Sequence, residues 1–400
     1  MPALRLARRV QGIQPSATLA LTARARALKA EGKDVVALTA GEPDFETPLP
    51  VREAAIEALK KGGAVGRYTP VQGLPEVVKA VSEKFKRDNG LDYAPEQVML
   101  SCGAKHCIFN AVGALVEEGD EVIIPAPYWV SYPEMVKFFG GKPVVLDTSK
   151  SGFVLTESAM RKAVSKRTRM LIVNSPGNPT GAVWDEAAQR ALARVMEGSD
   201  IAVVSDEIYE KLIYEGTHTA FASLSADAFA RTITVNGVAK SYAMTGWRIG
   251  YAGGPAEVIK SMVALQSHST SNPATVAQVA TLRALLHDPD ELPHWRSKYA
   301  ARRDRMVAGL NKAAGVKCAM PGGAFYVFPD LRAWIGRKHQ GRPLKDDRAI
   351  CEALLTRALV GGVPGCEFGA PGWVRFSYAA SDADIEKAIS RIQHFAAELD

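Results

Sequence analysis

The sequence predicts an α/β fold with a mostly parallel sheet, joined to a smaller α+β domain. Between about residues 92 and 254, short β-branched runs alternate with helical patterns, which is typical of consecutive βαβ units. After about residue 290 the pattern changes to a long charged helix, short strands and a final helix that begins at Asp382. The length of 400 residues leaves room for both parts, because one domain usually takes about 100–200 residues.

Seven short apolar runs are the expected strands of the large sheet. Apart from Glu121 and Arg248, which begin two of them, the runs consist of β-branched, apolar or small residues, as in strands that are covered on both faces. The runs are residues 98–100, 121–124, 144–146, 170–173, 201–204, 232–235 and 248–251. We therefore expect a seven-stranded, mostly parallel sheet.

The intervening segments have helical periodicity. Residues 105–118 place five apolar side chains on one face, and residues 186–197 show a similar pattern. The five are Ile108, Phe109, Val112, Leu115 and Val116. In the C-terminal part we expect a helix over 294–313 and strands over 324–328 and 374–378.

These elements suggest three segments. We expect residues 1–50 to form an N-terminal arm and part of the small domain, 51–290 the large domain, and 291–400 the small C-terminal domain. The first thirty residues contain five arginines and no acidic residue, a composition that superficially resembles an organelle transit peptide. We favour an arm, because Pro15-Ser16-Ala17-Thr18 has the pattern of a turn that leads into a helix.

Composition excludes several classes of protein. The net charge of +6 is spread along the chain, which suits small anionic ligands better than nucleic acid. We expect no membrane span, because no apolar run approaches the roughly 18 residues that one requires. Five cysteines without a C-x-x-C pair predict neither a disulfide framework nor a metal site, and are typical of a cytoplasmic protein.

Two loops that follow predicted strands are candidate ligand sites. The turn Ser101-Cys102-Gly103-Ala104-Lys105 would direct the backbone N–H groups of Gly103 and Ala104 toward a phosphate, although such a glycine can also serve only a tight connection. The loop 174–181 contains two prolines and two glycines at the carboxyl end of a strand, where α/β sheets bind ligands. Asn178 is its candidate ligand-facing residue, and a turn-rich connector is the alternative.

Three charged side chains also stand at informative positions. Asp206 follows a buried strand, where a carboxylate needs a cation or a donor; a helix N-cap is the alternative. Lys240 follows the strand 232–235 and by itself could be a surface lysine. Arg375 alternates with Trp373 and Ser377 and either binds a carboxylate or phosphate or lies in water on an edge strand.

In their order and spacing these motifs resemble the class I and II aminotransferases, which bind pyridoxal phosphate on the fold of aspartate aminotransferase (fold type I). The resemblance extends from residues 15–18 through 39–45 to Arg375. It is nearest to the bacterial aspartate aminotransferase subgroup, through the motifs at 128–133 and 243–251. The resemblance implies a homodimer with shared active sites.

The resemblance also implies a role for each candidate residue. Lys240 would form the Schiff base with pyridoxal phosphate and then carry the proton at the substrate Cα. Asp206 would pair with the pyridinium nitrogen, Asn178 and Tyr209 would bind the phenolic oxygen, and Trp129 would stack on the ring.

The remaining implied contacts are to the phosphate and to the substrate. The phosphate ligands would be Gly103, Ala104, Lys105, Arg248 and, from the neighbouring subunit, Tyr68. Arg375 would bind the substrate α-carboxylate beside the Gly41 backbone, with Trp129 and Asn178 completing the substrate pocket.

The sequence departs from the family pattern at two positions. Ser267 stands where the animal enzymes have the arginine for the distal carboxylate, so Lys105, or Ser16 and Thr18, are candidates to replace it. Gly237 stands where many relatives have a phosphate-binding serine, which suggests that the phosphate contacts are redistributed.

The expected activity is reversible ping-pong transfer of the amino group from L-aspartate to 2-oxoglutarate, which gives oxaloacetate and L-glutamate. The first alternative is an aromatic amino acid or prephenate aminotransferase on the same fold. A cofactor-binding regulatory module and a lyase or synthase of this fold are two further alternatives.

Overall fold

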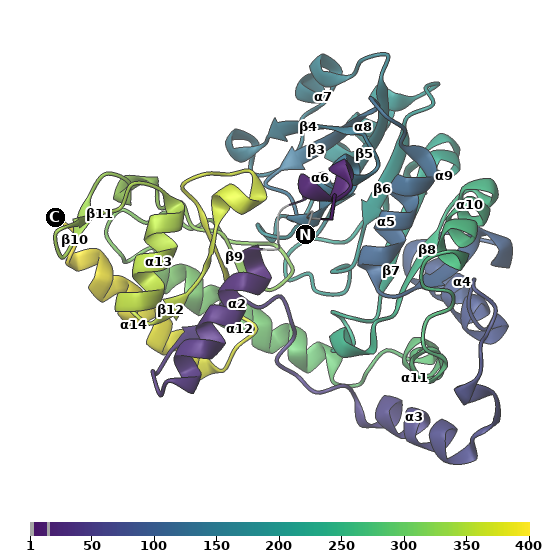
Figure 1. The fold of residues 1–400 in the computed structure, drawn as a ribbon, viewed down its shortest axis with the longest axis horizontal. Coiled ribbons are helices and arrows are strands. Elements are labelled where there is room, and N and C mark those ends of the chain that lie inside the picture. The colour runs from purple at the N-terminus through teal and green to yellow at the C-terminus, as the bar shows by residue number, and fades with distance from the viewer. Residues whose placement is uncertain (1–3, 14–16) are drawn as a thin grey trace.

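The computed structural model describes residues 4–13 and 17–400 (Figure 1). The predicted turn at Pro15 and Ser16 therefore lies partly outside the described residues. The helices are α1 Arg8–Gln11, α2 Ala17–Ala30, α3 Leu49–Lys61, α4 Pro75–Asn89, α5 Ala104–Leu115, α6 Ser131–Phe138, α7 Glu157–Ala163, α8 Glu186–Met196, α9 Ala226–Arg231, α10 Ala256–Ser267, α11 Thr275–Leu286, α12 Leu292–Leu310, α13 Asp347–Arg357 and α14 Asp382–Ala397.

The predicted seven-stranded sheet is confirmed. Its strands are β2 Val98–Ser101, β3 Glu121–Ala126, β4 Lys142–Asp147, β5 Thr168–Asn174, β6 Ala202–Asp206, β7 Thr232–Gly237 and β8 Gly250–Gly253. Their order across the sheet is β2-β8-β7-β6-β5-β3-β4. β8 runs antiparallel to both neighbours, and the other pairs are parallel, so the carboxyl ends of β5, β6 and β7 meet at one edge.

Helices cover both faces of this sheet. Ile124, Ile172 and Val204 pack on the face that α5 covers, whereas Leu171 and Val203 pack on the opposite face with α8. Because successive strand residues point to opposite faces, each strand must be apolar throughout. This explains why the strands appear in the sequence as continuous apolar runs.

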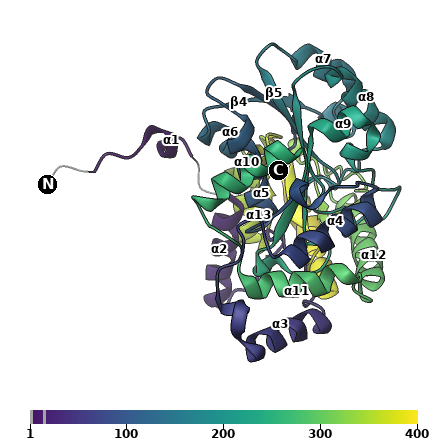
Figure 2. The same cartoon turned by 90° about the vertical axis from the view of Figure 1, so that its right-hand side faces the viewer.

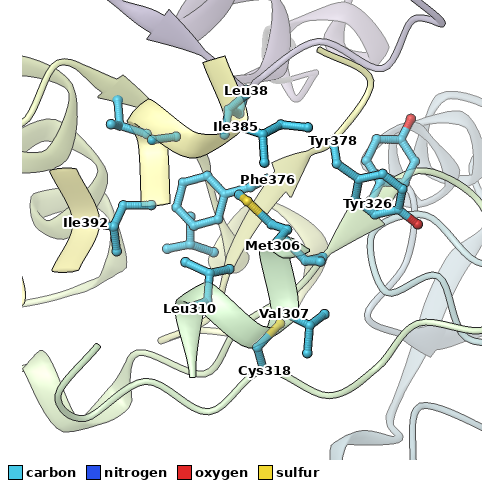
Figure 3. Packing of buried hydrophobic residues seen from close by; sticks show 14 of the residues in the cluster. Leu38, Met306, Val307, Leu310, Cys318, Tyr326, Phe376, Tyr378, Ile385 and Ile392 are labelled. Carbon is cyan, nitrogen blue, oxygen red and sulfur yellow. The ribbon is translucent and has the colours of Figure 1, made fainter. Parts of the chain in front are cut away.

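A second group of elements forms the C-terminal part. The short strands are β1 Val36–Ala37, β9 Tyr326–Val327, β10 Lys338–His339, β11 Arg342–Pro343, β12 Val360–Gly361, β13 Val363–Pro364 and β14 Val374–Ser377. α12 and α14 enclose a core that contains Met306, Phe376 and Ile385 (Figure 3). Leu38 belongs to the same core, and β1 pairs with β12, so a segment near the N-terminus completes this part of the fold. The segment boundaries at 50 and 290 stay a prediction.

The structure corrects several predicted boundaries. The helix expected over 105–118 ends at Leu115, because the chain turns at Gly119, with φ +89°, to enter β3. The strand expected over 248–251 is shifted to Gly250–Gly253, since Arg248 adopts a left-handed conformation with φ +58°. Asp206 is the last residue of β6, so the helix N-cap alternative is wrong.

The elements of the C-terminal part differ from the prediction in length. The strand expected over 324–328 is reduced to Tyr326–Val327, because Ala324 has a positive φ of 56°. The helix expected over 294–313 spans Leu292–Leu310, with a proline in its first turn, where that residue is tolerated. The helix expected from Asp382 begins there.

Two segments stand at the periphery. α1 contacts α6, whereas residues 4–7 before it run out from the body (Figure 2), and Leu4 and Leu6 in that segment are exposed. α3 lies at the other edge and packs on α11. In the described part of the chain, no helix combines the length and apolar character that crossing a membrane requires.

Candidate active site

The candidate site lies where the carboxyl ends of β5 and β6 and the turn after β7 meet β9 and β14. Asn174 and Asp206 end neighbouring strands and are paired in register. The Asn174 amide nitrogen donates to the Asp206 carbonyl oxygen at 2.9 Å, and its side-chain oxygen accepts from the Asn178 backbone N–H at 2.8 Å. Asn174 thus holds the two candidate ligand segments against each other.

Asp206 is a buried carboxylate with one unused oxygen. Its Oδ2 accepts a hydrogen bond from the Tyr132 hydroxyl at 2.6 Å, whereas Oδ1 has no hydrogen-bond partner among the described residues. Burial raises the pKa of Asp206 to about 6, although the bond from Tyr132, the backbone N–H of Ile208 and the charge of Lys240 oppose that shift. The unused oxygen suits a cationic N–H donor.

Lys240 directs its amine into the same site. It lies in the turn that follows β7, and its Nζ donates to the carbonyl oxygen of Gly41. Desolvation lowers the pKa of Lys240 to about 8; the carboxylate of Glu42 opposes the shift and the charge of Arg375 adds to it. A larger fraction of the amine is therefore unprotonated near neutral pH, which is the form that attacks a carbonyl carbon.

The predicted phosphate turn is brought together with Arg248. Gly103 has φ +88° and ψ 159°, and a Cβ there would lie 2.6 Å from Nη2 of Arg248. Arg248 is itself held by the Thr245 carbonyl oxygen at 2.9 Å. The first N–H groups of α5 have no partner within the helix, so this turn and the guanidinium form a cradle for an anion.

Lys105 and Trp129 lie beside that cradle. The Lys105 ammonium lies 4.9 Å from the centroid of the Trp129 ring. Burial lowers the pKa of Lys105, and the nearby charge of Arg248 lowers it further. Trp129 also makes an edge contact with Tyr132, so one aromatic pair connects the cradle with Asp206.

Arg375 is buried on β14, with 2% exposure, so the alternative of an edge-strand arginine in water is wrong. It donates to Asn178 Oδ1 at 2.9 Å and to the Thr39 carbonyl oxygen at 2.7 Å. Its Nε has no partner among the residues that the structure describes. Its guanidinium carbon lies 4.6 Å from the centroid of the Tyr326 ring. A charge-assisted donor is therefore available for a carboxylate.

Tyr209 meets a residue that the sequence analysis did not single out. Its hydroxyl lies 2.8 Å from the hydroxyl of Tyr326, which comes from β9. Burial raises the pKa of Tyr209 well above its ordinary value, and the neighbouring Tyr326 raises it further. Both phenols are therefore neutral and serve as hydrogen-bonding groups.

A buried charge network supports the segment that carries Asp206 and Tyr209. Glu207 lies between these two residues in the sequence and Glu210 follows Tyr209. Glu207 pairs with His218 at 2.8 Å, and Glu210 pairs with the buried ammonium of Lys84. Burial opposes protonation of His218, but the charge of Glu207 raises its pKa. The ammonium of Lys84 supplies the cation beside these acidic groups, so we assign no metal to this cluster.

The predicted phosphate ligand Tyr68 and the two positions that depart from the family pattern, Ser267 and Gly237, are not part of this cluster in the single chain. Tyr68 is 93% exposed. Ser267 is exposed and donates to the Ala264 carbonyl oxygen of its own helix at 2.6 Å. A Cβ at Gly237 would lie 2.9 Å from the Ile249 carbonyl oxygen, which gives the glycine a packing reason in this chain.

The sequence analysis missed Tyr132, Tyr326 and Thr39 as members of the site. Tyr132 belongs to the motif at 128–133, three residues after Trp129 on the first turn of α6, and this spacing could have identified it. Thr39 begins the segment 39–45 that carries part of the resemblance, so its nearness to Gly41 could have identified it. Tyr326 reaches the site through the fold of the C-terminal part, and no local sequence signal distinguishes it.

This fold and this arrangement of lysine, aspartate and arginine define an aminotransferase of classes I and II. Residues 33–392 match the family described as aminotransferase class I and II, and the chain belongs to that family. Among curated relatives, it is 45% identical over 392 residues to an aspartate aminotransferase of Bacillus sp. (strain YM-2), with 98% of each chain covered. It is 47% identical to the aspartate/prephenate aminotransferase of Thermus thermophilus, covering 96% of this chain and 97% of that one.

Solved structures agree with this assignment. The chain superposes on an aspartate aminotransferase from Rhizobium meliloti with a TM-score of 0.95 and 42% identity, covering 100% of both chains. For the Thermus thermophilus aspartate aminotransferase with maleate, the TM-score is 0.91 and the sequence identity is 46%, with 98% of this chain and 100% of that one covered. The predicted family and fold type are therefore confirmed.

Proposed function

We propose that this chain is an aspartate aminotransferase that transfers the amino group of L-aspartate to 2-oxoglutarate and produces oxaloacetate and L-glutamate. The observation that carries the proposal is the combination of three unsatisfied or activated groups in one buried site. These groups are the Lys240 amine with its lowered pKa and two atoms that have no hydrogen-bond partner in the described part of the chain, Oδ1 of Asp206 and Nε of Arg375. The names of the relatives support aspartate as the amino donor.

The residues present fit pyridoxal 5'-phosphate. The free oxygen of Asp206 suits the ring nitrogen, and the cradle that a Cβ at Gly103 would fill suits the phosphate. Asn178 and Tyr209 would bind the phenolic oxygen, Trp129 would cover one ring face, and Ala104, Lys105 and Arg248 would complete the phosphate contacts. When bound, the protonated ring accepts the electron pair that remains when the Cα–H bond breaks.

Lys240 supplies the proton transfer in this proposal. Its Nζ would hold the cofactor at rest and, once the amino substrate has displaced it, would carry the proton that leaves the substrate Cα. The lowered pKa keeps a useful fraction of the amine unprotonated. The Gly41 carbonyl oxygen, which accepts from Nζ, orients the amine.

Arg375 determines which substrate bond faces Lys240. Its two Nη groups are already bound by Asn178 and Thr39, so the guanidinium is held in place before the substrate arrives. Binding of the α-carboxylate beside Gly41 would fix the orientation of Cα. Such preorganisation lowers the entropic cost of reaching the reactive geometry.

The distal carboxylate of aspartate needs another cation, because Ser267 supplies none. We propose Lys105, which stands beside Trp129 and whose lowered pKa arises from burial and the charge of Arg248. A carboxylate close to Lys105 would stabilise its charged form. Ser16 lies outside the described residues, and Thr18 stays a prediction.

We also propose a homodimer with shared active sites. The exposed Tyr68 would reach the phosphate of the other subunit, and an exposed face of α3 supports an interface nearby. The apolar side chains of that face, at helical spacing, are Leu49, Ile56 and Leu59. Five free cysteines support a reducing, cytoplasmic location.

A complementation experiment tests the shared sites. In a hybrid of Tyr68→Ala and Lys240→Ala subunits, one site carries both defects and the other carries neither. Recovery of activity on mixing two weakly active or inactive homodimers supports the arrangement. Absence of recovery in a verified hybrid contradicts it.

The proposed activity is tested by the absorbance of the protein loaded with pyridoxal phosphate. Bleaching of the Schiff-base band by aspartate alone, and its return with 2-oxoglutarate, supports both half-reactions. A band that aspartate leaves unchanged overturns the substrate, and failure to form a band overturns the cofactor. Ammonia release without an oxo-acid acceptor would favour a lyase.

Prephenate is a second candidate amino acceptor, because several relatives are named aspartate/prephenate aminotransferases. Turnover of aspartate with prephenate and with 2-oxoglutarate, compared at equal enzyme concentration, separates the two candidates. Phenylalanine as donor tests the aromatic alternative in the same assay.

A further inference from the structure

We propose that Tyr326 is a positioning residue that donates its phenolic hydrogen to Tyr209 and so commits the Tyr209 hydroxyl to donate toward the cofactor. The inference rests on the proposed function, since it concerns the oxygen that Tyr209 would bind.

Geometry brings Tyr326 into contact with three members of the site. Its hydroxyl lies 2.8 Å from that of Tyr209, and its ring lies beneath Arg375 at 4.6 Å. A Cβ at Gly41 would lie 2.7 Å from the same hydroxyl, so there is no space for a side chain between them. Tyr326 has no exposed surface, and its hydroxyl therefore has little freedom to find another partner.

A count of hydrogens determines the direction of the bond. Each phenol carries one hydrogen and can both donate and accept. If Tyr209 donates to the phenolic oxygen of the cofactor, it has no hydrogen left for Tyr326. Tyr326 must then be the donor, and a hydrogen bond received by Tyr209 strengthens the one that it gives.

Charges around Tyr326 favour this direction. Burial raises the pKa of Tyr326, whereas the positive charge of Arg375 and the bond with Tyr209 lower it, and the carboxylate of Glu42 opposes them. A cation close to a phenol makes its O–H a stronger donor. The side chain that would bind the substrate carboxylate thus lies against the tyrosine that orients Tyr209.

The pair also joins two parts of the fold. Tyr209 follows β6 of the large sheet, and Tyr326 stands on β9, which pairs with β14, where Ser377 is opposite Tyr326. Arg375 belongs to β14 as well. Tyr326 therefore connects the strand that carries the carboxylate-binding arginine to the segment that carries Asp206 and Tyr209.

The test measures the pKa of the Schiff base between Lys240 and pyridoxal phosphate by absorbance, in wild type, Tyr326→Phe, Tyr209→Phe and the double variant. Loss of the Tyr326 donor weakens the bond to the phenolic oxygen, and we expect the Schiff-base pKa to rise by about half a unit. Because Tyr326 acts through Tyr209, the double variant should have the pKa of Tyr209→Phe. Tyr378→Phe is the matched control, since it removes another buried hydroxyl that bonds Ala324, and its Schiff-base pKa should equal that of wild type.

A second measurement covers the case in which Tyr326→Phe does not fold. Replacement of Tyr326 by a monofluorinated tyrosine keeps the shape and makes the hydroxyl a stronger donor, so the Schiff-base pKa should fall. An unchanged pKa in the folded variants, or additive shifts in the double variant, overturns the inference. Absence of a Schiff-base band in wild type would instead overturn the proposed function.

Discussion

The hydroxyl of Tyr132 donates to Oδ2 of Asp206 at 2.6 Å, whereas Oδ1 has no hydrogen-bond partner within residues 4–13 and 17–400. One oxygen is thus used to orient the carboxylate, and the other is kept for a cation. Burial raises the pKa of Asp206 to about 6, and the hydrogen bonds that the carboxylate receives only partly offset that shift. The proposed role of Asp206 depends on this difference between its two oxygens.

Replacement of Asp206 by Asn should stabilise the cofactor-free protein in a pH-dependent way. The pKa of Asp206 in the folded state is above its unfolded value, so its ionisation destabilises the fold as the pH rises through about 4 to 6. We expect Asp206→Asn to be more stable than wild type by up to about 3 kcal/mol at about pH 8, and to show little difference at about pH 4. Urea denaturation at both pH values measures this. If the two proteins differ in free energy of unfolding by the same amount at both pH values, the raised pKa of Asp206 is contradicted.

The pKa of Lys240 predicts the pH dependence of cofactor attachment. The free amine is the reacting form, so the rate at which cofactor-free protein forms its Schiff base should rise with pH and level off above about 8. Stopped-flow absorbance measures the rate, and Lys240→Ala, which should form no band, is the control. If the midpoint of this pH–rate curve lies near the pKa of an ordinary exposed lysine, desolvation does not lower the pKa of Lys240.

Arg375→Lys should weaken substrate binding without loss of the cofactor. A lysine keeps the charge but loses the fork that contacts Asn178, Thr39 and a carboxylate together. We expect kcat/KM for aspartate to fall by at least about a hundredfold, with the Schiff-base spectrum retained. A simple amine that lacks the carboxylate should react equally with both proteins. A comparable loss with that amine would indicate general damage to the site.

Lys105→Ala tests the proposed ligand of the distal carboxylate. We expect kcat/KM for aspartate to fall by about tenfold or more relative to that for alanine, because only aspartate carries the second carboxylate. Lys137→Ala, at an exposed lysine of α6, is the matched control. If the ratio of aspartate to alanine turnover is unchanged, Lys105 has no part in this selectivity.

Gly103→Ala should weaken cofactor binding through the phosphate cradle. The new Cβ would lie 2.6 Å from Arg248, and the backbone conformation of Gly103 is unfavourable for alanine. We expect the dissociation constant of pyridoxal phosphate to rise by about tenfold or more. Gly246→Ala is the control, since a Cβ there would meet no atom of the described residues within 4 Å. Fluorescence titration of the cofactor-free proteins measures the dissociation constant for each variant. If the two variants bind pyridoxal phosphate equally well, the proposed phosphate cradle at Gly103 is contradicted.

Much of the fold was predictable because its signals are local. Strands covered on both faces must be apolar throughout, so β3, β5, β6 and β7 are visible as runs in the sequence. The ends of strands were less predictable where the backbone leaves the strand direction close to the candidate site. Arg248 was expected in a strand, yet it leaves the strand direction and adopts a left-handed conformation with its side chain against Gly103.

The sequence by itself determined the family, the order of the strands along the chain and the identity of Lys240, Asp206 and Arg375 as candidates, because strand-end motifs are short and contiguous. The tertiary structure decided which partners these residues meet. Tyr132 reaches Asp206 from 74 positions away, and Tyr326 reaches Tyr209 from 117 positions away. Such contacts depend on strand order and on the packing of the C-terminal part against the sheet, which no local pattern records.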